Sequence, residues 1–435
     1  MKQIVSTNLR ETLHYFLIVI LFYGIQSCKS PNGPTTADVA LTVTDVSCTE
    51  AWLKLTVNNL TSNTKVQLVR NSSLVNTFNI TSHDTTLYDD SLSPNQTYVY
   101  QLFELQNGNA KAKSEMVTAK TMDTTSSNFT WETFTFGGNA GSSALYDVSI
   151  VNDTCIFAVG EIYQLDSLGQ PNPNAYNLIQ WNGNEWKLSR IKFYTFCGQP
   201  STGSYPTRSI FAYSGNNIWV SSNSQIVHYN GENQLSTECI SVSVNKLWGS
   251  EENNLFAVGN NGKIAHYYAS QWSSIESSTS SIINDIWGIT NRQGKLILYC
   301  PVSSFFVPGD KKILKITGSI VDSVEWNRDV RLYSAWTSND NFLYVCGEGA
   351  YVNKFGKWEK ISLPEVGTNS IRGNDINDIF IVGDYGFKAH FDGVRWQVLS
   401  TYNERGYSKV DVKGNIVAIC GNYNGKGLIE IGIRN

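Results

Sequence analysis

Two stretches of the chain decide its fold, because they repeat each other almost position by position. The first is Leu247–Trp272, LWGSEENNLFAVGNNGKIAHYYASQW, and the second is Ile371–Trp396, IRGNDINDIFIVGDYGFKAHFDGVRW. In both stretches a glycine, Gly259 or Gly383, precedes the closing tryptophan by thirteen residues. Self-similarity of this kind is the signature of a repeat architecture, and it has to be interpreted before any single residue.

Further copies of this unit extend over residues 128–435. They are centred on Phe157–Gly160, Trp219–Ser222, Ile286–Gly288, Trp336–Gly347 and Ile419–Gly421. Each copy contains four short strand signals separated by tight turns, and several turns carry Asn-Gly or Asp-Gly, the pairs that favour two-residue hairpin loops. Seven units of about 44 residues have the pitch of propeller blades. We therefore predict an all-β protein whose main part is a seven-bladed β-propeller.

The last unit is one strand short, because the chain stops at Asn435. The missing strand is available at Phe129–Phe134, where Trp131 stands in for the tryptophan that closes the other units. The sequence therefore predicts that residues near 129–135 pair with the C-terminal strand and close the ring.

The units resemble the Trp-Gly-Ser … Phe-Ala-Val-Gly … His-Tyr-Asp-Gly … Trp repeats of bacterial secreted propeller proteins. The resemblance covers the C-terminal three quarters of the chain and concerns the fold. Because one fold hosts many functions, it does not identify a ligand.

Residues 38–121 show the period-two alternation of half-buried strands, which predicts a β-sandwich. The segment Leu92–Tyr100, LSPNQTYVY, resembles the turn and strand of fibronectin type III domains. In that resemblance Tyr98 takes the place of the tyrosine-corner residue and Trp52 that of the core tryptophan. Such modules are usually spacers, and residues 122–127 would link this one to the propeller.

The N-terminus has the features of an export leader. Lys2 and Arg10 precede an apolar run, Tyr15–Tyr23, which is short for a transmembrane helix. It ends at Ile25-Gln26-Ser27-Cys28, which resembles the lipobox of bacterial lipoproteins, although Gln26 departs from that pattern. We expect residues 1–27 to be the signal peptide, Cys28 to be lipidated and residues 28–37 to form a tether. The location implied is the bacterial cell envelope, lipid-anchored; an ordinary signal peptide is the alternative.

Composition excludes several classes of protein. Only 16% of the residues are charged and the formal net charge is −4, so nothing indicates a nucleic-acid-binding surface. Seven cysteines remain without Cys28, an odd number that argues against a full disulfide framework. Cys300, Cys346 and Cys420 replace valines of other repeats and are expected to be buried apolar residues. A pairing of Cys197 with Cys239 is compatible with the sequence, which does not decide it.

No motif in the chain specifies catalysis, a cofactor or a metal. His228, His266 and His390 occupy equivalent positions in three different repeats, too far apart to share a zinc ion, and are interpreted as structural. The chain has no Gly-x-Ser-x-Gly, phosphate loop or dinucleotide fingerprint. We therefore expect no metal and no cofactor, and a function that is not enzymatic.

Loop lengths indicate which face of the ring binds a ligand. With strands a to d running from the axis to the rim, the b–c and d–a connections lie on one face. The three long segments, Glu161–Tyr176, Arg190–Arg208 and Pro301–Lys312, all fall in those connections. They and the last d–a connection supply the candidate binding residues, all of them aromatic: Tyr163, Tyr176, Tyr194, Phe196, Tyr205, Phe305, Phe306, Tyr402 and Tyr407.

Aromatic side chains on loops held by a rigid scaffold suit stacking on sugars or anchoring a protein. The leading hypothesis is a membrane-anchored envelope or surface protein that binds a glycan or a protein through this face. A polysaccharide-active hydrolase or lyase on a propeller scaffold and a scaffold subunit of an envelope complex are the alternatives.

Overall fold

The computed structural model describes residues 39–58, 60, 64–106, 108–304, 309–339, 341–354 and 356–435. The leader, Cys28 and the tether therefore lie outside the described residues. The N-terminal part contains a three-stranded sheet in the order β1-β2-β5 and a five-stranded sheet in the order β4-β3-β6-β7, in which β8 pairs with β6. The strands are β1 (Val39–Val46), β2 (Ala51–Val57), β3 (Thr64–Arg70), β4 (Ser73–Ile80), β5 (Asp84–Asp89), β6 (Thr97–Gln106), β7 (Asn109–Lys113) and β8 (Val117–Lys120).

Of the two residues on which the fibronectin resemblance depends, Tyr98 has the expected hydrogen bond, whereas Trp52 lies in an apolar cluster with Trp336 and Phe342 rather than in a core of the sandwich sheets. Trp52 on β2 is fully buried. The Tyr98 hydroxyl accepts a hydrogen bond at 2.9 Å from the backbone N–H of Ser93, a few residues upstream, as in a tyrosine corner. The assignment to that family stays a prediction.

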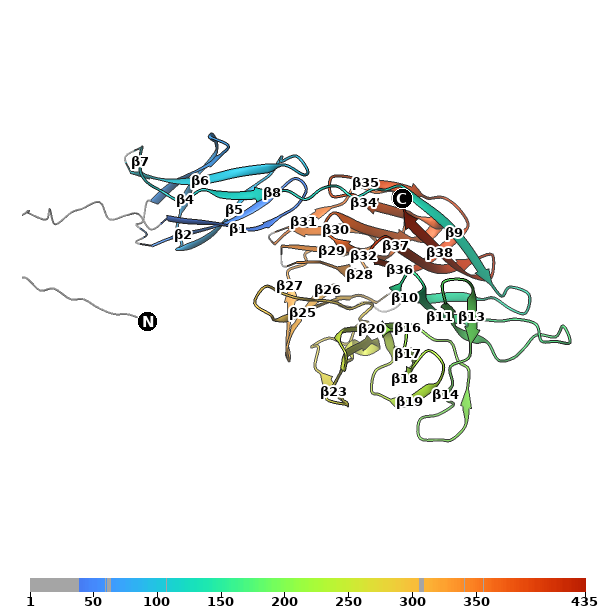
Figure 1. Cartoon of the computed structure of the whole chain (residues 1–435). Coiled ribbons are helices and arrows are strands. Elements are labelled where there is room, and N and C mark those ends of the chain that lie inside the picture. The colour runs from blue at the N-terminus through green and yellow to red at the C-terminus, as the bar shows by residue number, and fades with distance from the viewer. Residues whose placement is uncertain are drawn as a thin grey trace, which may run out of the picture. The chain divides into compact units, whose positions relative to one another are not determined.

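The rest of the chain forms seven four-stranded antiparallel sheets, which are the blades of a propeller (Figure 1). Blade 1 is β10 (Ala144–Asn152), β11 (Cys155–Ile162), β12 (Tyr176–Trp181) and β13 (Trp186–Ser189). Blade 2 is β16 (Ser209–Ser214), β17 (Asn217–Ser222), β18 (Gln225–Tyr229) and β19 (Gln234–Cys239). Blade 3 is β20 (Val244–Glu251), β21 (Asn254–Gly259), β22 (Ile264–Tyr268) and β23 (Gln271–Ile275).

Blade 4 is β24 (Trp287–Thr290), β25 (Leu296–Val302), β26 (Lys312–Thr317) and β27 (Ile320–Val324). Blade 5 is β28 (Leu332–Trp336), β29 (Phe342–Gly347), β30 (Gly349–Lys354) and β31 (Lys357–Lys360). Blade 6 is β32 (Thr368–Asp375), β33 (Asp378–Gly383), β34 (Lys388–Phe391) and β35 (Trp396–Ser400). Two 3-10 turns, η1 (Asn260–Gly262) and η2 (Asp384–Gly386), follow the second strands of blades 3 and 6.

Blade 7 closes the ring, and the predicted closure is confirmed. It consists of β36 (Arg405–Lys413), β37 (Ile416–Tyr423), β38 (Lys426–Arg434) and β9 (Phe129–Phe136). Strand β9 pairs antiparallel with β38 from Phe129 opposite Arg434 to Phe136 opposite Gly427, and Figure 1 shows the two strands side by side. Gly432 faces Trp131 in this register, and a Cβ there would come within 2.7 Å of the indole ring. Only glycine therefore accommodates the closing tryptophan.

The order of the strands separates the connections into two groups. Connections from a to b and from c to d contain at most five residues in the described blades. The longest ones, 163–175, 190–208, 276–286 and 303–311, are all b–c or d–a connections. Antiparallel pairing within each blade puts all b–c and d–a connections on one side of the ring, which we call the looped face. Of the described helices, none has the length and apolar character needed to cross a membrane.

Candidate functional site

Two long insertions of the looped face are joined into one unit beside blades 1 and 2. Residues 190–208 contain a small hairpin, β14 (Phe193–Tyr194) paired with β15 (Thr202–Gly203). The buried Asn177 side chain donates to the carbonyls of Ile191 and Tyr205, both at 2.9 Å. Arg190 Nε donates to the Asn174 carbonyl at 3.0 Å, which ties this insertion to residues 163–175.

A disulfide fixes the tip of the same insertion. Cys197 is bonded to Cys239, the last residue of the outer strand of blade 2. Gln225 holds the base of the hairpin, because its side-chain oxygen accepts from Tyr194 N and its nitrogen donates to Tyr194 O, both at 2.8 Å. The insertion is therefore held at both ends, and a ligand would meet a preformed surface.

The structure divides the predicted binding aromatics by their exposure. Phe196 and Tyr402 are both 72% exposed on the looped face. Four others, Tyr163, Tyr176, Tyr194 and Tyr205, are half-buried and make contacts within the loops. The guanidinium of Arg190 lies 3.7 Å from the centre of the Tyr176 ring, and Tyr194 pairs with Thr202 in the hairpin. The Tyr205 hydroxyl donates to Thr195 Oγ1, and the Tyr163 hydroxyl donates to Glu161. Burial and the hydrogen bond to Glu161 raise the pKa of Tyr163.

Tyr407 does not belong to the looped face, and its assignment as a binding residue was wrong. It lies within β36, is 1% exposed and donates a hydrogen bond to Glu430 at 2.8 Å. Its pKa is raised by burial and by the Glu430 charge. The last d–a connection contains only residues 401–404, so Tyr407 is already inside the innermost strand. Phe305 and Phe306 lie outside the described residues.

The innermost strands carry a ring of polar side chains at the axis, which the sequence analysis did not identify. At six of the seven blade junctions a side-chain oxygen near the axis accepts from a backbone N–H of the next blade. The donors and acceptors are Ile210 N to Asp147 (3.0 Å), Leu247 N to Ser209 (2.9 Å), Ala335 N to Asp285 (3.2 Å), Ile371 N to Ser334 (3.2 Å), Val410 N to Ser370 (3.3 Å) and Ile150 N to Asp411 (2.7 Å).

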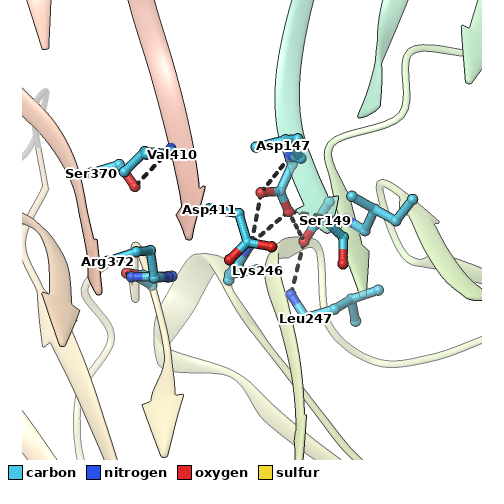
Figure 2. A network of polar contacts seen from close by, with 12 residues as sticks. Asp147, Ser149, Lys246, Leu247, Ser370, Arg372, Val410 and Asp411 are labelled. Atoms are coloured by element: carbon cyan, nitrogen blue, oxygen red, sulfur yellow. Dashed lines mark hydrogen bonds and ion pairs between the residues drawn. The ribbon is translucent and has the colours of Figure 1, made fainter. Parts of the chain in front are cut away.

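Ion pairs connect blades that are not neighbours in the ring, and Figure 2 shows the one between Lys246 and Asp147. Blade 3 places Lys246 at the axis, and its ammonium donates to both oxygens of Asp147 in blade 1 at 2.6 and 2.7 Å. Arg372 of blade 6 makes a two-pronged pair with Asp285 of blade 4 at 2.7 and 2.9 Å. Burial opposes ionisation of Asp285, but Arg372 and Lys409 hold the pKa of this carboxyl well below its ordinary value. These ion pairs thus hold blades together across the axis.

A sequence signal for this ring exists in hindsight. In each blade a polar residue is followed by an aliphatic one at the corresponding place, within the first strand or, in blade 4, directly before it. The pairs are Asp147-Val148, Ser209-Ile210, Lys246-Leu247, Asp285-Ile286, Ser334-Ala335, Ser370-Ile371 and Lys409-Val410. Alternation alone predicts that such polar residues face solvent. In the closed ring, however, the polar residues of the first strands face the central axis and the neighbouring blades.

The three repeat histidines have the structural role that was predicted for them. Each stacks on the aromatic residue of the neighbouring strand: His228 on Trp219, His266 on Phe256 and His390 on Phe380. Each also bonds an Asn or Asp at the start of that strand, Asn217, Asn254 or Asp378, at 2.7 to 3.0 Å. Among the described residues no group of three or more His, Cys, Asp or Glu side chains could hold a metal ion.

In blade 6 this arrangement superficially resembles a catalytic triad. Ser127 Oγ lies 2.6 Å from His390 Nδ1, and His390 Nε2 lies 2.9 Å from Asp378. In a serine hydrolase the serine bonds Nε2 and the carboxylate bonds Nδ1, the reverse of this order. The His–Asx pair also recurs in blades 2 and 3 without a serine. We therefore interpret it as part of blade packing that holds the chain ahead of β9.

Hollows lie on both faces of the propeller. A cavity of about 290 Å³ on the looped face is lined by the d–a connection of blade 5, including Ile361, Leu363 and Val366. A cavity of about 360 Å³ at the axis on the other face is lined by Trp248, Trp287 and Asp411, among others. A larger cavity of about 580 Å³, lined by Phe256, Tyr268 and Leu296 among others, also lies on that other face between blades 3 and 4. The hollows therefore do not distinguish the two faces.

Comparison with known proteins places the fold but not a family. No protein-family model matches the chain, and no curated protein matches it. The solved structure described as "YCF48 bound to D1 peptide" is 14% identical, with a TM-score of 0.52 over 72% of this chain and 100% of that chain. YCF48 from Cyanidioschyzon merolae is 12% identical, with a TM-score of 0.49 over 69% of this chain and 98% of that chain. At 14% identity, the likeness to the first of these structures shows a shared fold alone.

Proposed function

We propose that this protein is a binding protein that docks another protein on the looped face of its propeller. The observation that carries the proposal is the pair of joined insertions beside blades 1 and 2. They expose Leu168 to 82% and Phe196 to 72%, on loops held by the disulfide and by Asn177. Large apolar side chains on rigid loops are the usual anchors of protein interfaces.

The chemistry of these anchors favours a polypeptide over other ligands. Leu165 and Leu168 are aliphatic, and an aliphatic side chain gains by burial against another apolar surface. The similar structure of YCF48 is described as bound to a peptide, which supports the same class of ligand here.

We also propose that the protein works in the bacterial cell envelope, lipid-anchored through Cys28. The lipobox-like sequence before Cys28 and the polar tether after it support this location. Replacing Cys28 with Ala is expected to release the protein from the membrane fraction after cell lysis and ultracentrifugation. Retention of Cys28→Ala in the membrane pellet would contradict the anchor.

The docking face can be tested in intact cells with a photo-cross-linking amino acid at single positions of the full-length protein. A cross-linker at position 196 is expected to give a discrete adduct of higher mass, and Leu168→Asp should abolish it. Leu235, which is 55% exposed beside a c–d turn on the other face, provides the matched control position. An adduct at position 235 and none at position 196 would refute the assigned face.

A further inference from the structure

Blades 3 and 6 build the same loop with different residues. The turn η1 follows Gly259 in blade 3, and η2 follows Gly383 in blade 6. The middle residue has nearly identical backbone angles in both, with φ 55 and ψ 33 at Asn261 and φ 53 and ψ 33 at Tyr385. The same left-handed backbone position is therefore occupied by asparagine in blade 3 and by tyrosine in blade 6.

The neighbouring d–a connections repeat the comparison. In blade 3 Ser277 Oγ donates to the Gly262 carbonyl, and in blade 6 Ser400 Oγ donates to the Gly386 carbonyl at 2.7 Å. Shortly after each serine the chain takes a left-handed turn, at Ser278 with φ 56 and at Tyr402 with φ 57. Blade 6 thus has tyrosines where blade 3 has small polar residues.

Tyrosine is a poor choice for both positions if stability alone matters. The left-handed region suits Asn, whose short side chain bonds locally, and disfavours bulky residues. Packing does not compensate, because Tyr385 is 64% exposed and Tyr402 is 72% exposed. Exposed residues in a disfavoured conformation point to a function outside the fold.

The two loops are fixed to each other. Asn403 N donates to the Tyr385 carbonyl at 2.9 Å. The Asn403 side chain fills the space beside Gly386, where a Cβ would lie 1.9 Å from its oxygen. Both rings are therefore presented from one rigid platform.

The polar groups beside the rings are acceptors for hydroxyl groups. Asp384 accepts one hydrogen bond from Asn369 at 2.8 Å, and Glu404 accepts one from Asn424 at 3.2 Å. An ionised carboxylate has about four acceptor sites, so each keeps capacity for further donors. Flat aromatic faces stack on the C–H face of a sugar ring, while carboxylates bind its hydroxyls. The two negative charges oppose an acidic sugar.

We infer that Tyr385 and Tyr402 form a binding site for neutral carbohydrate at blades 6 and 7. The inference rests on the proposed use of the looped face but not on the protein partner, whose anchors lie at blades 1 and 2. The platform would add a second ligand class to the same face.

The test uses the full-length protein in a detergent that has no sugar head group. Cellohexaose, xylohexaose, mannohexaose and chitohexaose are titrated into it by calorimetry, with hexagalacturonate as the acidic counterpart. The inference predicts binding of at least one neutral sugar. The double variant Tyr385→Asn, Tyr402→Ser, which copies blade 3, is expected to bind it at least about tenfold more weakly, as loss of two stacking rings implies, and to melt no lower than the parent.

Tyr268→Ala is the matched control, because Tyr268 is 64% exposed beside a c–d turn on the other face. Its sugar affinity should equal that of the parent. No binding of any neutral sugar, equal binding by the double variant, or preference for hexagalacturonate would overturn the inference. The double variant is also tested for cross-linking at position 196, which reports on protein docking independently of sugar binding. The position-196 adduct is expected to persist in that variant, because the substitutions change only the carbohydrate site.

Discussion

The carboxylate of Asp285 connects three blades. It bonds the Ala335 N–H of blade 5 and pairs with Arg372 of blade 6, while it belongs to blade 4 itself. Both partners of the ion pair are buried, with side-chain exposures of 5% for Arg372 and 0% for Asp285. Burying two charges costs desolvation energy, which their mutual attraction offsets. Removing only one of the two partners is strongly destabilising, because the remaining charge is then buried without compensation.

Asp285→Asn is therefore expected to lower the free energy of unfolding by about 3–5 kcal/mol at pH 7, because it leaves the Arg372 charge buried without its partner. Urea unfolding followed by tryptophan fluorescence measures the change. Asp153→Asn, at an exposed a–b turn, is the control and should change stability by less than about 0.5 kcal/mol.

The same variant should alter the dependence of stability on pH. Because the folded pKa of Asp285 is depressed, its contribution is present above the unfolded value of about 4 and is lost as pH falls through the lower folded pKa. Asp285→Asn should thus show a smaller loss of stability between pH 5 and pH 2 than the parent. Parallel curves for the two proteins in this range would contradict the assigned role.

Some single residues were predicted correctly and others were not, depending on whether the repeat alone determines their surroundings. Cys300, Cys346 and Cys420 are buried as predicted, because their place in the repeat is a core position. Tyr407 was misplaced because a repeat does not reveal where a loop ends and the next inner strand begins. The axial ring was missed because Asp147 or Lys246 in an alternating strand looks like a solvent-facing residue until the ring is closed.

Elements were predicted more accurately than residues. The expected segment Arg190–Arg208 lies between β13 and β16, and the expected Glu161–Tyr176 brackets the connection 163–175. Turn chemistry and the repeat period are local signals, so they locate such insertions well. The hairpin β14–β15 was not predicted, since its two-residue strands depend on Gln225 and the disulfide rather than on any pattern.

The disulfide should stabilise the insertion rather than the ring. It closes a segment with a sequence separation of 42, for which a gain of about 2–4 kcal/mol is typical. Replacing Cys197 and Cys239 with Ser is expected to expose residues 190–208 to limited trypsin digestion, with cleavage at Arg190, Lys192 or Arg208 resolved by mass spectrometry. Cleavage rates equal to those of the parent would show that hydrogen bonds alone hold the insertion.

At the scale of the whole molecule, the ring depends on a strand from the other end of the propeller sequence. Strand β9 supplies the outer strand of blade 7, and Ser127 and Arg434 extend the contact at its start, where Arg434 donates to the Ser126 carbonyl at 3.1 Å. Deleting residues 129–135 is expected to lower the melting temperature by at least about 10 °C, because a complete strand ladder is lost. Scanning calorimetry measures it, and an unchanged melting curve would exclude closure by this strand.

The number of blades, the closure and the unequal faces all followed from the repeat, because each is a consequence of counting strands along the chain. What the looped face binds did not follow, since exposed Leu168 and Phe196 or left-handed Tyr385 are properties of three-dimensional loops. The functional assignment accordingly rests on the structure of those loops.

The most direct test of the looped face is hydrogen–deuterium exchange of the full-length protein, alone and bound to the partner captured at position 196. The account predicts slower exchange on binding in residues 163–175 and 190–208, with no change in the a–b turns such as 252–253. Protection of those a–b turns, with exchange of the two insertions unchanged, would contradict it.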